Sequence, residues 1–424
     1  MSTQPLTSVT RRDFVRTAAA ASLLAAFPAR FDVFAAGSDT IKVGVIGCGG
    51  RGTGAAIDCL KADPGVEIVA LGDLVPDRVE SSLARLMKEF PTRVKVPADR
   101  QFVGFDNYKG VCAVPDVNLI VTAAPPGFRP LHLKAAVDAG KHVFMEKPVA
   151  VDPVGIRSVL ASSDLAKQKN LAIVAGTQRR HQRRYVEMMQ RIHDGQIGEI
   201  VAAQCYWNMG ALWVKERTAT MSEMEWQCRN WLYFSWLSGD HIVEQHMHNI
   251  DVVNWAIAAM PKNVMGMGGR AARTAPEYGN VFDHFAVEYE YPNGVRVLSM
   301  CRQTKGAAER VEERIVGTKG VAWSSGRITG EKPWQLDGDE VNPYVQEHID
   351  LIASIRKGAP LNEGRQVAES TLCAIAGRMS AYTGRAVSWD WVLNTSKLDL
   401  SPAKYEFGPN LVHPVAIPGF TELV

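Results

Sequence analysis

The stretch with the most potential for chemistry is SGDHIVEQHMHNIDVVNW, residues 238–255, which places three histidines among three acids. Residues four apart on a helix share a face, so Glu244 could hold the imidazole of His248 in one tautomer. The other ring nitrogen would then be free to take up a proton, which makes His248 a candidate general base. The stretch must therefore form a helix that faces a site.

A metal site is the alternative for the same stretch. His241, Glu244 and His248 fall on one helical face, with His284 or His181 as further ligands, and nitrogen and oxygen donors of this kind suit zinc. His246 is interpreted as a packed or solvent-bridging histidine.

A nucleotide site is predicted at the start of the chain. The apolar run from Ile41 to Ile46 leads into Gly47-x-Gly49-x-x-Gly52 and then an alanine-rich helical sequence. Such glycines allow a tight turn, close approach to a diphosphate, and packing of helix on strand. A second strand ends at Asp73, where a carboxylate can accept from a ribose 2′-hydroxyl. The acid would repel a 2′-phosphate, which favours NAD over NADP. Because the charge of Arg78 could compensate that of a 2′-phosphate, NADP remains the less favoured alternative.

The length and composition of the chain indicate its domain organisation and limit its partners. With 424 residues the chain exceeds a single hydrophobic core, and strands alternating with helices up to about residue 165 predict a doubly wound parallel sheet. Because 47 basic side chains nearly cancel 45 acidic ones, nucleic acid is not an expected partner. The seven cysteines form no CxxC pair, so neither a disulfide framework nor a thiolate zinc site is indicated.

Residues 1–36 resemble a twin-arginine export signal. TRRDFVR is followed by a weakly hydrophobic run from Thr17 to Phe27, and cleavage is expected near Ala35 or Ala36. A cytosolic amphipathic N-terminus or an uncut anchor is the alternative. Export by this route carries folded proteins, so a cofactor inserted in the cytoplasm could travel to the periplasm. No later segment is apolar enough for stable membrane insertion.

Four motifs in order resemble the Gfo/Idh/MocA oxidoreductases, a family of mainly sugar and polyol dehydrogenases: GVIGCGGRG, the Gly72-Asp73 pair, AGKHVFMEKP and DGQIGEI. The resemblance runs from about Ile41 to Trp391. It implies an NAD-binding Rossmann domain, placed at residues 37–165, and an α+β domain at 166–424 with a large open, mainly antiparallel sheet. That sheet would carry the substrate pocket and a homo-oligomer interface, for a dimer or tetramer.

The resemblance also implies roles for individual residues. Lys147 matches the lysine that steadies the developing alkoxide, while Glu244, His248 and Asp251 match an acid-histidine-acid pattern in which Glu244 departs from the usual aspartate. The residues predicted to bind the cofactor are Gly47, Gly49, Gly50, Arg51, Gly52, Asp73, His132, Glu146 and Lys147. No metal is assigned.

Arginines and aromatic residues in segments 176–185 and 226–236 suit a carbohydrate, because sugars present apolar faces edged with hydroxyl groups. The candidates for the substrate pocket are Arg180, Arg229, Trp231 and Asp240.

The leader and the nucleotide site together narrow the function. The periplasm offers no recycling pool of NAD, so an exported enzyme must hold its cofactor tightly and regenerate it in place. Sugar oxidoreduction meets this condition. A redox-neutral glycosidase that oxidises its glycoside transiently also meets it, and a non-catalytic sugar-binding protein is the third possibility.

Overall fold

The computed structural model describes residues 40–424; the predicted export signal, residues 1–36, lies outside the described residues. The first part of the chain alternates strands with helices, as predicted. Its elements are β1 (Ile41–Ile46), α2 (Gly50–Ala62), β2 (Val66–Asp73), α3 (Pro76–Glu89), β3 (Gln101–Val103), α4 (Asn107–Ala113), β4 (Leu119–Thr122), α5 (Arg129–Asp138), β5 (His142–Met145), α6 (Pro153–Gln168) and β6 (Ile173–Ala175).

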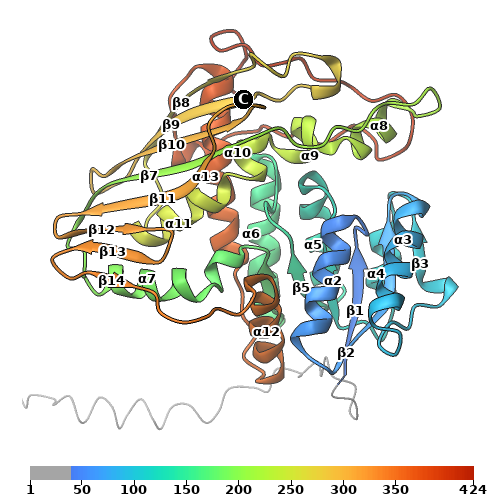
Figure 1. The fold of residues 1–424 in the computed structure, drawn as a ribbon. Coiled ribbons are helices and arrows are strands. Elements are labelled where there is room, and N and C mark those ends of the chain that lie inside the picture. Colours follow the sequence, from blue (N-terminus) through green and yellow to red (C-terminus); the bar gives the residue numbers. More distant parts are fainter. Residues whose placement is uncertain (1–39) are drawn as a thin grey trace, which may run out of the picture. The chain divides into compact units, whose positions relative to one another are not determined.

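The strands of this part form one parallel sheet in the order β3-β2-β1-β4-β5-β6. The strands β4, β5 and β6 are buried along their whole length, which explains their continuous apolar runs. The order reverses between β1 and β4, and ligands of such sheets bind at that point, beyond the carboxyl ends of the strands. The doubly wound sheet is confirmed (Figure 1).

The sheet extends beyond the predicted boundary at residue 165. The strand β6 pairs with β5 at Val143↔Ile173, so the first sheet ends at Ala175. The helix α6 returns the chain to this last position. Its N-cap Asp152 accepts a hydrogen bond from the backbone N–H of Gly155, at 2.7 Å.

The remaining residues form the second, α+β part. Its elements are α7 (Arg183–His193), β7 (Ile200–Met209), α8 (Glu223–Arg229), α9 (Ser235–Ser238), α10 (His241–Glu244), α11 (Met247–Ile257), β8 (Asn263–Gly269), β9 (His284–Glu290), β10 (Arg296–Gln303), β11 (Arg310–Gly317), β12 (Gly320–Trp323), β13 (Arg327–Gly330), β14 (Trp334–Gln335), α12 (Pro343–Arg356), α13 (Gly364–Thr383), β15 (Val387–Ser388) and α14 (Trp389–Asn394).

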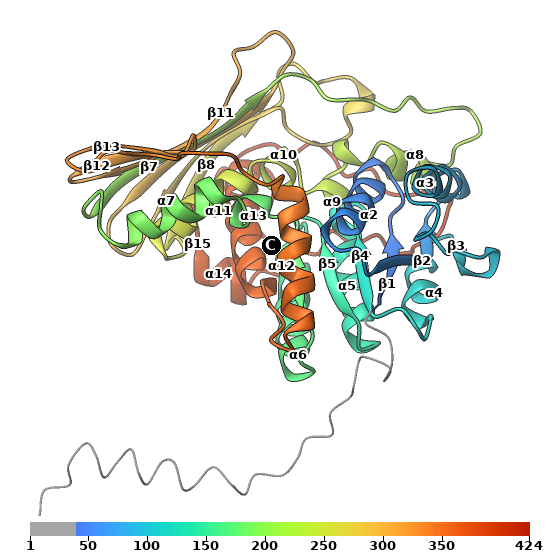
Figure 2. The same cartoon turned by 60° about the horizontal axis from the view of Figure 1, so that its bottom comes forward.

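Nine strands make the second sheet, in the order β14-β13-β12-β11-β7-β10-β9-β8-β15. It is antiparallel except where β10 runs parallel to β7, and β9 and β10 form a hairpin. The helices α7, α11 and α13 lie on one side of this sheet (Figure 2). On β10 the buried residues Val297, Ser299 and Cys301 alternate with more exposed ones, as expected when one face is covered.

Within residues 40–424, no helix combines the length and apolar character that crossing a bilayer requires.

Candidate active site

The glycine turn between β1 and α2 opens onto a cavity of about 770 Å³. Gly47 has φ of +91°, and a Cβ there would lie 2.4 Å from the backbone nitrogen of Ala124. A Cβ on Gly52 would lie 1.7 Å from the carbonyl oxygen of Gly47. Both positions therefore require glycine, one for the turn and the other for packing of helix on strand.

Gly49 and Gly50 leave the space that a diphosphate would need. A Cβ on Gly50 would meet nothing within 4 Å, and one on Gly49 would meet only Nη1 of Arg78, at 3.7 Å. Both glycines line the cavity at the N-terminus of α2, where unpaired backbone N–H groups and the helix dipole favour an anion. The residues of this loop thus fit a dinucleotide.

Asp73 lies at the end of β2 and lines the same cavity. Its carboxylate accepts hydrogen bonds from the backbone N–H groups of Cys48, at 2.7 Å, and Val75, at 3.2 Å. Burial raises the pKa of Asp73, while the charge of Arg78 opposes that rise. Since a carboxylate oxygen can accept more than one hydrogen bond, these contacts leave capacity for a hydroxyl group.

Arg51 and Glu146 interact with each other. The Nε of Arg51 donates to Oε1 of Glu146 at 2.5 Å, and the guanidinium also lies 4.8 Å from the ring centre of Tyr344. Arg51 lines the cavity, whereas Glu146 is 4 % exposed and is not among the residues lining it. This pair therefore ties the glycine loop to the end of β5, immediately before Lys147.

His132 lines the cavity between two aromatic rings. It stacks on Tyr108, with ring centres 4.8 Å apart, and on Phe128, at 5.9 Å. Burial lowers the pKa of His132 to about 3, so this imidazole is neutral throughout the physiological range.

Lys147, Glu244 and His248 form the candidate catalytic centre. Lys147 follows β5, so it lies at the same edge of the parallel sheet as the glycine turn. Its ammonium group donates to the carbonyl oxygen of Glu244, at 2.6 Å, and to Oε1 of the same residue, at 3.0 Å. The other carboxylate oxygen of Glu244 is buried and has no hydrogen-bond partner. This oxygen therefore keeps an unused hydrogen-bond acceptor.

The imidazole of His248 is held against Trp207, a residue of β7 that sequence reasoning missed. The two rings are stacked with centres 5.9 Å apart, and Arg179 lies over the same indole. Burial, followed by the positive charges of Lys147 and Arg179, holds the pKa of His248 well below its ordinary value. His248 is thus neutral, and one of its two ring nitrogens carries no proton.

The predicted hydrogen bond between Glu244 and His248 is wrong. The helix expected within residues 238–255 is interrupted, because α10 ends at Glu244 and α11 begins at Met247. Between them the fully buried His246 turns toward β10, where its Nε2 lies 2.7 Å from the hydroxyl of Ser299. This turn directs Glu244 to Lys147 instead.

Asp251 and the substrate candidate Arg180 bind each other. The guanidinium makes two hydrogen bonds to the carboxylate, each 2.8 Å long, and Ser370 donates a further one at 2.7 Å. Arg180 also lies 4.4 Å from the ring centre of Trp255. The positive charge of Arg180 and the negative charge of Asp251 therefore compensate each other inside the protein.

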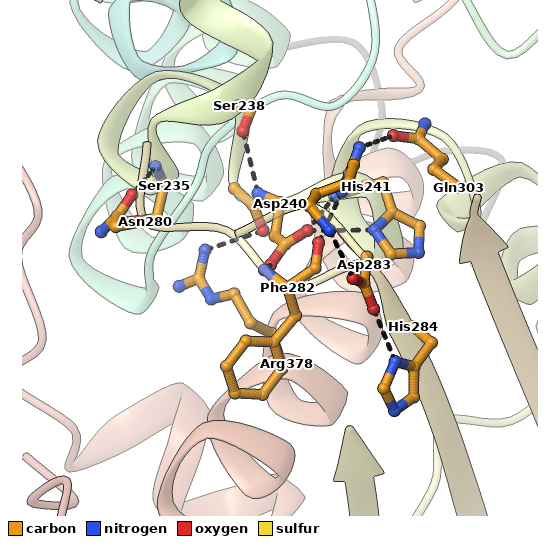
Figure 3. A network of polar contacts seen from close by, with 12 residues as sticks. Ser235, Ser238, Asp240, His241, Asn280, Phe282, Asp283, His284, Gln303 and Arg378 are labelled. Atoms are coloured by element: carbon orange, nitrogen blue, oxygen red, sulfur yellow. Dashed lines mark hydrogen bonds and ion pairs between the residues drawn. The ribbon is translucent and has the colours of Figure 1, made fainter. Parts of the chain in front are cut away.

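Asp240 is a structural residue, contrary to its prediction as a substrate ligand. It is fully buried, and its side chain accepts from the N–H groups of His241, at 2.6 Å, and Phe282, at 2.7 Å. Tyr382 donates a further hydrogen bond at 2.6 Å. Figure 3 shows the contacts of Asp240 with His241 and Phe282, together with Arg378, which donates to the carbonyl oxygen of the neighbouring Gly239. Asp240 anchors the start of α10 and hence the position of Glu244.

Arg229 and Trp231 lie at the nucleotide cavity rather than beside Lys147. Both line it, together with Trp213 and Lys215, which sequence reasoning missed. The guanidinium of Arg229 pairs with Asp77 at the start of α3, at 3.1 Å. The second part of the chain therefore supplies one wall of this cavity, a tertiary feature that no local spacing signals.

The C-terminal segment braces the same region. Phe105, which lines the cavity, packs edge-on against Phe407 with ring centres 5.2 Å apart. The neighbouring Gly408 exchanges hydrogen bonds with Met224 and Ser222 around α8. These contacts join the wall of the parallel-sheet part to that of the second part.

The residues 40–424 contain no group of three or more His, Cys, Asp or Glu side chains arranged to hold a metal ion. The histidines considered as metal ligands contact carboxylates instead: His241 contacts Asp240 at 3.1 Å, His284 contacts Asp283 at 2.7 Å, and His181 contacts Asp350 at 2.6 Å.

The environment of His181 leads us to expect that the free energy of unfolding falls as the pH rises. Burial lowers its pKa, but the hydrogen bond to Asp350, at 2.6 Å, and the carboxylate of Glu363, 3.1 Å from the other ring nitrogen, outweigh burial and raise the pKa to about 9. Because the folded-state value exceeds the unfolded one, the protonated form stabilises the fold below about pH 6.5. The contribution, on the order of 2–3 kcal/mol, is lost as the pH rises through the folded pKa.

Urea unfolding at a series of pH values measures this effect, with His181→Gln expected to show a much flatter profile over the same interval. His413→Gln, in the C-terminal segment, serves as the matched control and should follow the parent protein. An equally steep profile in His181→Gln would contradict the assignment.

Comparison with known proteins agrees with this geometry. Residues 41–177 match the oxidoreductase family with an NAD-binding Rossmann fold, GFO/IDH/MocA, and residues 185–323 match the GFO/IDH/MocA C-terminal domain. The chain therefore belongs to the GFO/IDH/MocA oxidoreductase family.

Curated relatives differ in how much they share with the chain. A glycosyl hydrolase family 109 protein of Streptomyces niveus is 39% identical over 113 residues, which are 26% of this chain and 22% of the relative. The chain thus spans about a fifth of that relative's length. An inositol 2-dehydrogenase of Rhodococcus jostii is 23% identical over 401 residues, covering 88% of this chain and 99% of the relative.

Solved structures share the fold. The aldose-aldose oxidoreductase of Caulobacter crescentus superposes with a TM-score of 0.65 at 16% identity, covering 82% of this chain and 99% of that one. The scyllo-inositol dehydrogenase of Lactobacillus casei with bound NAD(H) and scyllo-inositol gives 0.63 at 19% identity, with the same coverage.

Proposed function

We propose that the protein is an NAD-dependent oxidoreductase acting on a CH–OH group of a sugar or polyol. The observation that carries the proposal is the contact of Lys147 with Glu244, beside the neutral His248, at the sheet edge that holds the glycine turn. The inositol 2-dehydrogenases among the relatives support the substrate class.

The residues of the centre divide the work of alcohol oxidation. His248 takes the hydroxyl proton, and the ammonium of Lys147 stabilises the negative charge that develops on the substrate oxygen. Glu244 orients Lys147 through its ion pair and offers its free oxygen to a neighbouring hydroxyl. A nicotinamide dinucleotide held by the glycine turn and Asp73 would supply the hydride acceptor that conversion of the carbinol to a carbonyl product requires. Trp207 offers an apolar ring beside His248 for the sugar face.

Export by the twin-arginine route to the periplasm remains part of the proposal. Cell fractionation of a strain producing the full chain, compared with an Arg11→Lys, Arg12→Lys variant, tests it. The parent protein is expected in the periplasm and the variant in the cytoplasm; equal distribution of both would contradict the proposal.

The cofactor is proposed to be NAD, held tightly. The carboxylate of Asp73 lines the cavity, and a 2′-phosphate placed beside it would meet a like charge. We expect NADH to bind about 100-fold more tightly than NADPH, since such juxtapositions cost several kcal/mol. In Asp73→Asn the preference should narrow, because the amide keeps the shape but not the charge. Fluorescence titration of cofactor-stripped protein measures both affinities, with the exposed Asp106→Asn as control.

A redox-neutral glycosidase is the second candidate, favoured by the similarity to a glycosyl hydrolase family 109 protein. The same centre could oxidise a glycoside hydroxyl, allow elimination of the leaving group and addition of water in its place, and then return the hydride with no net oxidation. Incubation with aryl glycosides and with free sugars, without added NAD, separates the two functions. A ketosugar product supports the oxidoreductase, whereas release of the phenol without ketosugar supports the glycosidase.

The uncovered face of the second sheet is proposed to bind a second copy of the chain. Met267 and Met300 flank Ala286 in register across β8, β9 and β10, and Met265 is 63% exposed on the same face. Apolar side chains gathered in this way mark association surfaces. We expect Met267→Glu to shift a dimer or tetramer toward monomer in light scattering. A monomeric parent protein at micromolar concentration would contradict the proposal.

A further inference from the structure

The wall that the second part contributes to the nucleotide cavity carries side chains without a role in the fold. Trp213 is 42 % exposed although it lines a cavity, and its one aromatic neighbour among residues 40–424 is Trp231, edge-on with ring centres 6.1 Å apart. Lys215 is exposed, and within the described part of the chain only its backbone makes hydrogen bonds, whereas its ammonium group makes neither a hydrogen bond nor an ion pair. Lys215 therefore does not stabilise this wall by burial or by an ion pair, and the one aromatic contact of Trp213 within residues 40–424 is the contact with Trp231.

The backbone that presents these two side chains is nevertheless held at defined points. The N–H of Lys215 donates to the side-chain oxygen of the fully buried Asn230, at 2.9 Å. The indole N–H of Trp226 donates to the carbonyl oxygen of Lys215, at 3.0 Å, and the hydroxyl of Tyr233 donates to that of Trp213, at 2.9 Å. The fold thus fixes the segment while leaving Trp213 and Lys215 directed to the cavity.

Charge around the cavity is unbalanced. Of the cations lining it, Arg51 pairs with Glu146, Arg85 with Glu89, and Arg229 with Asp77. Arg78 and Lys215 line the cavity without an ion pair among residues 40–424, and Asp73 is the one carboxylate that lines it within that range. Two cations without an ion pair on the wall of one cavity suit a ligand with two negative charges, such as a dinucleotide diphosphate bound at the N-terminus of α2.

We propose that Lys215 and Trp213 are cofactor-binding residues. They belong to the second part of the chain, whereas the glycine loop that holds the dinucleotide belongs to the first part. The ammonium of Lys215 binds the diphosphate together with Arg78, and the indole of Trp213 packs on the adenosine. Arg229 forms a salt bridge to Asp77, in the first turn of α3, and α3 is the helix that follows the strand ending at Asp73; this contact places the wall at the adenosine end. The inference rests on the proposed function and supplies the means by which an exported enzyme would retain its cofactor.

Cofactor retention in the purified protein tests the inference independently of turnover. The nicotinamide content is measured after repeated dilution and concentration, and the dissociation rate of bound NADH is followed by fluorescence during a chase with excess NAD⁺. Lys215→Ala and Trp213→Ala are each expected to release NADH about tenfold faster, the effect of one charged hydrogen bond or one stacked ring. Trp213→Phe, which keeps an aromatic ring, should recover most of the loss.

Lys305→Ala, in the exposed turn between β10 and β11, is the matched control and should release NADH at the parental rate. Far-UV circular dichroism of each variant checks that the fold is retained. Parental release rates in both Lys215→Ala and Trp213→Ala, with cofactor present in the parent, would overturn this inference alone. A parent protein that binds no nicotinamide would overturn the proposed function and the inference with it.

Discussion

Replacing Lys147 with alanine is expected to lower kcat about 10³-fold while leaving bound cofactor in place, because a charge that stabilises a developing alkoxide acts mainly in the transition state. Lys147 lies at the end of β5 and contacts Glu244 rather than the residues that line the nucleotide cavity. Steady-state rates with a saturating sugar or polyol, together with the nicotinamide content of the purified variant, measure the two effects separately.

The variant also leaves the carboxylate of Glu244 unpaired, so a double-mutant cycle is needed. Because the two residues act as a pair, Lys147→Ala with Glu244→Gln should cost far less than the sum of the single changes. Lys134→Ala, an exposed lysine on α5 that pairs with Asp138, should retain the parental kcat. Full activity of Lys147→Ala would contradict the assignment.

Replacing His248 with asparagine is expected to lower kcat by about 10²–10³-fold, the usual contribution of a positioned general base. The pH profile of the parent enzyme gives a second test. Since burial and the charges of Lys147 and Arg179 hold the pKa of His248 well below its ordinary value, the imidazole stays neutral as the solution is acidified. The rate should therefore show no inflection near pH 6.5, about where a free histidine titrates.

His413→Asn, in the C-terminal segment, is the matched control and should keep the parental rate and profile. The opposite result would be a parental pH profile with an inflection near the ordinary histidine pKa that disappears in His248→Asn. It would show that burial and the neighbouring charges do not lower the pKa of His248.

The parallel sheet and its nucleotide turn were predictable because their signals are local. Apolar runs define β1 and β2, and glycines stand where a Cβ would collide with backbone, as at Gly47 and Gly52. The end of the sheet was harder to predict. The strand β6 has only three residues, Ile173–Ala175, and its assignment depends on pairing with β5.

The candidate centre could be predicted only in part. Lys147, Glu244 and His248 were identified, but the pairing among them was not, since residues 238–255 read as a continuous helix. The interruption follows from the buried contact of His246 with Ser299, 53 positions away, and the Lys147 contact with Glu244 spans 97 positions. Periodicity cannot report such contacts. For the same reason Asp240, Trp213 and Lys215 could not be placed from the sequence.

The central claim is that the enzyme keeps its nicotinamide through successive turnovers. The most direct measurement is the nicotinamide content of protein recovered from outside the inner membrane, determined by absorbance and mass after mild denaturation, alongside its activity without added coenzyme. We expect close to one nicotinamide dinucleotide per chain, and turnover that continues without added coenzyme. Protein that is empty, and active only when coenzyme is supplied from solution in stoichiometric amounts, would contradict it.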